Sequence, residues 1–225
     1  MKWFHCLWTF PNTIWVYPVS AYILTAKTTE NMGVFLKKLC AYVYAKYIYS
    51  PSLSGIKGAV YALDVEICKG NYLGQMTGDF INENIEYELD KFAYMQTKKF
   101  IRGILTIDAY LNPNQVNLLQ NPEKLEIEHI LPKQWQNANY NGWTREEAET
   151  CIEKFGNKVL FEKKLNIQAG DGYFGQKKKK YERSNVEAVK DLSRLETNNW
   201  SKEELLQRDK ELKDRVIGFF KLQLN

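Results

Sequence analysis

The chain has 225 residues, which is long enough to bury a core as one larger domain or two small ones. Its composition, 44% hydrophobic and 26% charged, is that of a globular protein and excludes a disordered chain. The sequence contains no run of eighteen apolar residues, so we predict no transmembrane helix. The net charge of +4 is modest, and the four cysteines form no C-x-x-C pair, so we expect free thiols in a reducing cytoplasm rather than a zinc knuckle or a disulfide framework.

The first half of the chain has the apolar spacing of helices. Residues 1–18 are rich in aromatic side chains and interrupted by prolines, which predicts an extended arm or a short helix. Met32–Tyr49, Ala59–Cys68 and Lys91–Leu111 carry apolar residues at helical intervals, and Asn-Pro-Asn follows the last of them. We therefore interpret residues 1–120 as a helical N-terminal region that resembles a connector.

A different pattern begins at Leu125. The apolar run Ile127–Leu131 predicts a short strand that Pro132 ends, and an acid and a histidine lie side by side within it. A Gly-Asn turn signal opens a second strand-like run, Phe155–Phe161, and Phe174–Tyr181 has the pattern of a basic helix. The predicted order is strand, strand, helix, with polar residues at the junctions.

These segments resemble the HNH, or ββα-metal, endonucleases, and more specifically the C-terminal nuclease domain of GmrSD-type modification-dependent restriction enzymes. That domain carries a His-Ile-x-Pro segment, a Gly-Asn-x-x-Leu segment, a further asparagine, a Phe-x-x-Lys segment, and a late tryptophan followed by arginine. The HNH domain of the type II CRISPR effector nuclease looks similar too, with the same spacing between its two asparagines. The matching residues here are His129 to Pro132, Gly156-Asn157 with Leu160, Asn166, Phe174 with Lys177, and Trp200 with Arg208.

The resemblance implies a mainly α, overall α+β fold in which residues 121–225 form the nuclease domain with C-terminal helices. It also implies roles for individual residues. His129 would be the general base, because imidazole changes charge near neutral pH. Glu128 and Asn166 would offer hard oxygen ligands to one Mg²⁺ or Mn²⁺ ion. Asn157 would fix the loop that orients His129, and Lys177 would contact the phosphate.

Two of these positions depart from the family pattern. The acid before the histidine is glutamate rather than the commoner aspartate, and asparagine stands where the last ligand is often histidine. An amide ligand argues against a tight zinc site, because zinc favours cysteine, histidine and carboxylate.

Basic residues gather in the same half of the chain. They suit a DNA phosphate backbone, and binding of this kind weakens as the salt concentration rises. An ordinary solvated face is the simpler interpretation of any one of them. The predicted DNA-binding residues are Lys163, Lys164, Lys178, Lys179, Lys180 and Arg183.

The leading hypothesis is a metal-dependent endonuclease that cleaves DNA in restriction or phage defence. No phosphate-binding loop precedes residue 120, so a nucleotide-binding subunit or domain would be a separate partner. One metal site cuts one strand, and a homodimer is one route to double-strand cleavage. An alternative is a non-catalytic nucleic-acid- or partner-binding module that retains the nuclease fold. A third is an interaction protein that uses its helical half and the acidic segment 82–90. His5 has no partner motif and stays unassigned, and Trp200 is expected in the core.

Overall fold

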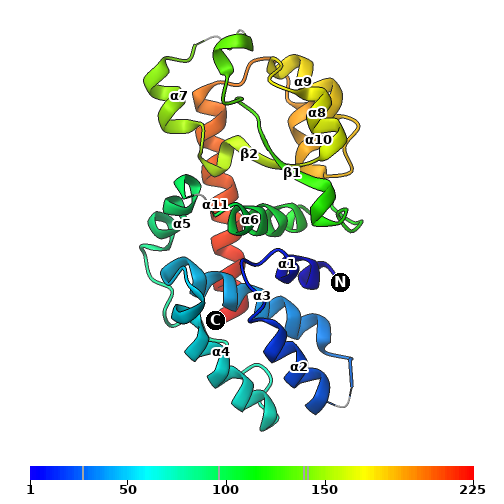
Figure 1. Ribbon diagram of the computed structural model, residues 1–225, viewed down its shortest axis with the longest axis vertical. Coiled ribbons are helices and arrows are strands. Elements are labelled where there is room, and N and C mark those ends of the chain that lie inside the picture. The colour runs from blue at the N-terminus through cyan, green and yellow to red at the C-terminus, as the bar shows by residue number, and fades with distance from the viewer. Residues whose placement is uncertain (27, 96, 139, 141) are drawn as a thin grey trace. The chain divides into compact units, whose positions relative to one another are not determined.

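The computed structural model describes residues 1–26, 28–95, 97–138, 140 and 142–225. Contacts divide the chain into two compact units, Met1–Phe92 with Val216–Asn225, and Ala93–Arg215. Two helices contribute residues to both units, α5 (Ile85–Tyr94) and α11 (Lys202–Leu224) (Figure 1). No helix in the described part of the chain is long and apolar enough to cross a membrane.

The first unit is built from helices whose apolar faces pack on one another. They are α1 (Lys2–Trp8), α2 (Val16–Thr25), α3 (Met32–Tyr49) and α4 (Leu53–Cys68). The bounds of α3 are those expected from the sequence, whereas α4 begins earlier because Ser52 caps its first turn by accepting a hydrogen bond from Gly55 N. Helix α1 packs on α3, and α4 packs on α2 and α3.

Asp64 on α4 is a site of pH-dependent stability in this unit. Its Oδ1 is buried without a hydrogen-bond partner among the described residues, and burial raises the pKa of its carboxyl from 3.8 to about 6. A raised pKa means that ionisation opposes folding, so stability is lost as the pH rises from about 4 to 6. We expect Asp64→Asn to increase the free energy of unfolding by about 1 to 2 kcal/mol at pH 8, after allowing for solvent screening, and to have little effect at pH 4. Urea unfolding at the two pH values measures this, and an equal effect at both would contradict it.

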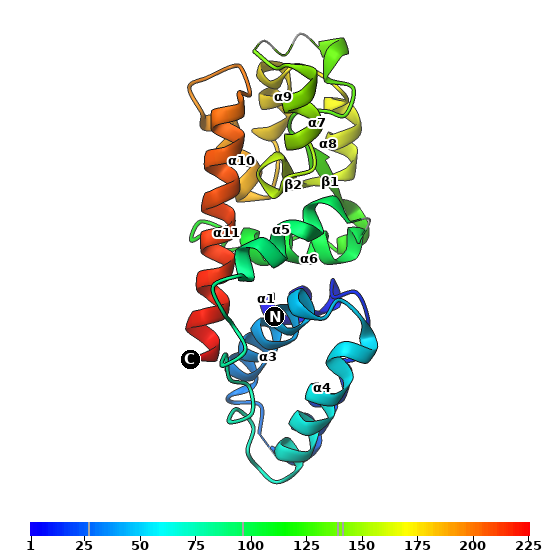
Figure 2. The same cartoon turned by 90° about the vertical axis from the view of Figure 1, so that its left-hand side faces the viewer.

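The second unit combines helices with one small sheet. Strands β1 (Leu125–His129) and β2 (Lys158–Glu162) pair antiparallel, with His129 opposite Lys158. Helix α6 (Lys98–Leu111) packs against β2, and α8 (Lys163–Ala169), α9 (Phe174–Tyr181) and α10 (Glu187–Arg194) gather beside the hairpin (Figures 1 and 2). In the sequence, α7 (Arg145–Cys151) and the short helix η3 (Phe155–Asn157) come between the two strands. The short helices η1 (Pro122–Lys124) and η2 (Trp135–Ala138) precede and follow β1.

The mainly helical α+β class predicted from the sequence is confirmed, and several details differ. The second compact unit begins at Ala93, because α6 packs against β2 within it, and the domain division at residues 120 and 121 stays a prediction. The predicted helix Lys91–Leu111 is divided between α5 and α6. Helix α8 was not predicted, since its two turns are too short for a periodic pattern; Gly170 follows it with a positive φ of 52°.

The last helix is confirmed together with its start signal. Ser201 N donates to the Glu204 carboxylate at 2.7 Å, and Glu204 N donates to Ser201 Oγ at 3.3 Å, which is the reciprocal arrangement of a capping box. Leu205 and Leu212 on its apolar stripe are buried in the second unit. Arg208 on this helix and Trp200 just before it contact the turn that precedes β2.

Candidate active site

His129 is the last residue of β1, and its side chain is 19% exposed. Its Nε2 atom lies 3.4 Å from Oε2 of Glu153, which belongs to the turn after α7. Lys158, opposite His129 in the sheet, reaches the same carboxylate, so the three side chains share one side of the hairpin. The structure therefore pairs the predicted base with a carboxylate that sequence reasoning missed.

Glu153 is held by two lysines as well as by His129. Its carboxylate lies 2.6 Å from Lys133 Nζ and 2.8 Å from Lys158 Nζ. Lys158 is buried and also donates to the backbone oxygens of Glu153 and Ala93. The hydrogen bond with His129, followed by those from the two lysines, holds the pKa of Glu153 well below its ordinary value. No motif marks Glu153 in the sequence, because its partners come from distant segments.

Glu128 points away from His129 into a buried cluster. Its Oε1 atom accepts hydrogen bonds from Lys177 Nζ at 2.7 Å and from Tyr181 Oη at 2.8 Å. Lys177 is 1% exposed, and its ammonium also donates to the backbone oxygens of His129 at 2.8 Å and Ile130 at 3.3 Å. Burial, followed by the charge of Glu128, raises the pKa of Tyr181. Lys177 thus fixes the end of β1. The phosphate contact predicted for it is untested, and here its ammonium has buried acceptors.

Asn166 on α8 is hydrogen-bonded to an acid that was not among the predicted site residues. Its Nδ2 atom donates to Oε2 of Glu126 at 3.1 Å, and Lys163 Nζ lies 3.7 Å from the other oxygen of that carboxylate. Glu126 and Glu128 lie on the same face of β1, because strand side chains alternate. Two carboxylates and one amide, all hard oxygen donors, therefore approach this face.

Glu126, Glu128 and Asn166 carry oxygen atoms of the kind that binds a divalent metal ion. Oxygen donors of carboxylate and amide groups suit Mg²⁺ and Mn²⁺, which also keep water and phosphate oxygens in their coordination shell. Within the described residues, no three histidine, cysteine or acidic side chains are grouped to hold a metal ion. The side-chain oxygens of Glu128 and Asn166 are of this chemical type, while Glu128 accepts from Lys177 and Tyr181 and Asn166 donates to Glu126. A site of few protein ligands, with Glu128 offering Oε2 and Asn166 its amide oxygen, stays a prediction.

Asn157 is buried and clamps the loop that follows His129. Its Oδ1 accepts from the backbone nitrogen of Leu131 at 2.8 Å, and its Nδ2 donates to the backbone oxygens of Leu131 and Ile152, each at 2.9 Å. Its backbone oxygen accepts from Ile130 N at 2.9 Å. These contacts are those of a loop-fixing residue, and they act two residues beyond His129. Its contribution to catalysis is still a prediction.

Trp200 and Arg208 support the turn that carries Asn157. Trp200 is buried, as expected, and donates from Nε1 to Asn157 Oδ1 at 3.2 Å. Arg208 donates to the backbone oxygens of Gly156 at 2.6 Å and Lys158 at 2.9 Å. A Cβ atom at Gly156 would overlap the backbone oxygen of Leu205, so this turn accommodates only glycine without movement. The late tryptophan and arginine of the motif are thus structural supports of the loop.

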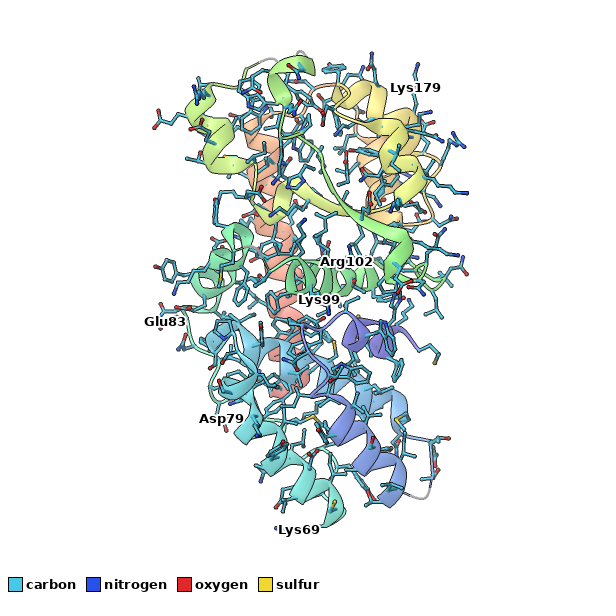
Figure 3. All side chains as sticks on the ribbon, in the orientation of Figure 1. Lys69, Asp79, Glu83, Lys99, Arg102 and Lys179 are labelled. Atoms are coloured by element: carbon cyan, nitrogen blue, oxygen red, sulfur yellow. The ribbon has the colours of Figure 1, made fainter. Side chains whose placement is uncertain are left out.

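The predicted DNA-binding lysines and arginine have different surroundings. Lys163, Lys164 and Arg183 line a cavity of about 530 Å³ together with Lys124 of η1. Lys178 donates to the backbone oxygens of Leu195 and Thr197, whereas Lys179 projects outward from α9 (Figure 3). Lys180 is partly exposed. The structure adds Lys124, which precedes β1, to the basic residues around the cavity. No sequence motif marked Lys124 as a binding residue.

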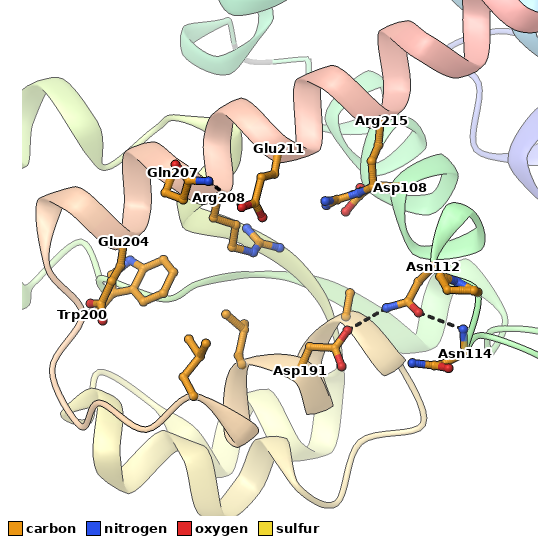
Figure 4. Close-up of a pocket in the computed structure, with 14 residues that line it drawn as sticks. Asp108, Asn112, Asn114, Asp191, Trp200, Glu204, Gln207, Arg208, Glu211 and Arg215 are labelled. Atoms are coloured by element: carbon orange, nitrogen blue, oxygen red, sulfur yellow. Dashed lines mark hydrogen bonds and ion pairs between the residues drawn. The ribbon is translucent and has the colours of Figure 1, made fainter.

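A second cavity, of about 490 Å³, lies among α6, α10 and α11 (Figure 4). Arg208 and Trp200 form part of its wall. Its charged groups have partners within the chain: Arg215 lies 2.9 Å from buried Asp108, and Asp191 accepts from Asn112 at 2.7 Å. Burial raises the pKa of Asp108, and the arginine opposes that shift. Asp108 and Asp191 on its wall are therefore already engaged by other residues of the unit.

Residues 76–215 match the family described as GmrSD restriction endonucleases, C-terminal domain. The chain belongs to this family. The GmrSD match includes every predicted site residue, together with Glu126 and Glu153, and it begins well before the predicted boundary at residue 121. No curated protein and no solved structure matches the chain.

Proposed function

We propose that the chain is a metal-dependent HNH-type endonuclease that hydrolyses phosphodiester bonds in DNA. The observation that supports this most is the position of His129 within the segment matched by the restriction endonuclease family. It is partly exposed at the end of a hairpin strand, and Lys177 and Asn157 fix the backbone from His129 to Leu131. The hairpin β1–β2 and the following helix α8 would form the ββα unit.

The chemistry assigned to these residues is hydrolysis by water. His129 would take a proton from the water as its oxygen attacks phosphorus, and the bond from phosphorus to the leaving oxygen would break. A bound Mg²⁺ or Mn²⁺ ion would supply stabilisation of the leaving oxygen. Glu128 and Asn166 would hold that ion, and Glu126 lies on the same strand face as Glu128. Lys177 and Asn157 would act by fixing the backbone from His129 to Leu131.

DNA would be held by the basic cavity and the exposed lysines. Lys124, Lys163, Lys164 and Arg183 surround the cavity near Glu126, which Lys163 approaches to 3.7 Å. The cavity is also lined by two acidic residues, Glu123 and Glu162. Glu162 is buried and accepts hydrogen bonds from Ser184 and from the Asn185 backbone. Phosphate groups of the DNA backbone are the ligand that such a basic surface favours. A separate nucleotide-binding subunit and a homodimer are further proposed partners.

Nicking of supercoiled plasmid by the purified chain tests this proposal. We expect nicking with Mg²⁺ or Mn²⁺, none with excess EDTA, and a lower rate at higher salt concentration. A His129→Ala preparation purified in the same way controls for a contaminating nuclease, and Glu149→Gln, an exposed change on α7, controls for the handling of variants. Plain plasmid and plasmid with modified cytosines are both used. DNA binding without cleavage of either plasmid would overturn the enzyme assignment in favour of a non-catalytic DNA-binding module.

A further inference from the structure

A hydrogen-bond acceptor faces one of the two ring nitrogens of His129 and orients the side chain. Nε2 faces the Glu153 carboxylate at 3.4 Å, and among the described residues Nδ1 makes no hydrogen bond. An ionised carboxylate can only accept hydrogen bonds, so a neutral imidazole in this pair carries its proton on Nε2. The contact is long, as such bonds often are in the absence of substrate. This arrangement leaves Nδ1 as the atom that can accept a proton.

The carboxylate is itself held in place. Lys133 and Lys158 contact its two oxygens from different segments, one after β1 and one at the start of β2. Lys158 is anchored in turn by the backbone oxygens of Ala93 and Glu153, and it is buried. These contacts keep Glu153 ionised, and they give it a fixed position beside His129 rather than a place on a solvated surface.

We propose that Glu153 is the positioning residue of the site, which holds His129 as the Nε2–H tautomer so that Nδ1 takes the proton from the attacking water. The proposal rests on the proposed nuclease function for its catalytic part. Its tautomer part stands on the geometry alone. Carboxylates that orient a catalytic imidazole in this way act through the histidine and do not touch the substrate.

The tautomer can be read directly by ¹⁵N NMR of the histidine rings. The chain has only two histidines, so His129→Ala assigns both sets of signals. At pH 8.5 we expect the wild-type His129 ring to be protonated almost entirely on Nε2, and the Nε2–H share to be smaller in Glu153→Gln, because an amide both donates and accepts. Glu149→Gln, which alters a carboxylate only four residues away, should leave the spectrum unchanged. A wild-type ring protonated mainly on Nδ1 would overturn the proposal without the need for any variant.

The catalytic part is tested on a DNA duplex of fixed length. We expect Glu153→Gln to lower kcat by about 10- to 100-fold with KM within twofold of wild type. The reason is that a misplaced His129 stabilises the transition state less, whereas substrate binding does not depend on its orientation. A variant that has the smaller Nε2–H share but keeps the wild-type kcat would overturn the positioning role. A wild-type chain with the Nε2–H tautomer but no nuclease activity would instead count against the proposed function, so the two failures are distinguishable.

Discussion

Replacing Lys177 with methionine is expected to lower the free energy of unfolding by about 3 to 5 kcal/mol, because it leaves a buried carboxylate without its cation. Glu128 is 5% exposed and, among the described residues, would keep a hydrogen bond from the hydroxyl of Tyr181 alone. The change also removes two hydrogen bonds to the backbone oxygens of His129 and Ile130. Methionine fills a similar volume, so the loss reports charge and hydrogen bonding more than packing. Urea unfolding at pH 7 measures the effect.

A double-mutant cycle separates the ion pair from its surroundings. Glu128→Gln alone should cost less than Lys177→Met, since the lysine keeps two backbone acceptors. The double variant should be more stable than the sum of the two changes predicts, by about 1 to 3 kcal/mol, because neither charge is then left alone. Additive losses would show that Glu128 and Lys177 act independently and would contradict the buried pair.

Short-range signals in the sequence predicted the local elements well. The basic helix Phe174–Tyr181 and the cap formed by Ser201 and Glu204 depend on residues within one or two turns, and the structure has both. The strand that ends before Pro132 and the Gly-Asn turn are likewise local. Their pairing into one hairpin could be expected from the motif order, because each segment is too short to bury its apolar residues alone.

The direction of side chains could not be predicted from the same signals. Lys177 opens a run of four lysines and resembles a solvated face, yet its position on the inner side of α9 buries it against β1. Its neighbour Lys179 points to solvent (Figure 3). A helix turns about 100° per residue, so consecutive lysines cannot share one environment. Only the packing of α9 on the hairpin decides which lysine is enclosed.

The same limit applies to the acids near His129. Sequence reasoning placed Glu128 and Asn166 together because a motif contains both, whereas in the structure Asn166 is hydrogen-bonded to Glu126. The alternation of strand side chains puts Glu126 and Glu128 on one face and His129 on the other. Glu153 could not be found from sequence because it comes from the turn after α7 and becomes relevant only when that turn packs beside β1. Long-range pairs of this kind require the fold.

His129→Ala is expected to lower the rate of DNA cleavage by about 10²- to 10⁴-fold, the usual contribution of a general base. Because the His129 side chain is partly exposed, its truncation should change the free energy of unfolding by no more than about 1 kcal/mol. Binding of DNA should persist, because the basic cavity is unchanged. Cleavage rates and DNA affinity measured on the same preparations separate the two effects. A His129→Ala chain that cleaves at the wild-type rate would remove the base assignment. If Glu153 acts only through His129, adding Glu153→Gln to His129→Ala should slow cleavage no further, since residues that act as a unit are not additive.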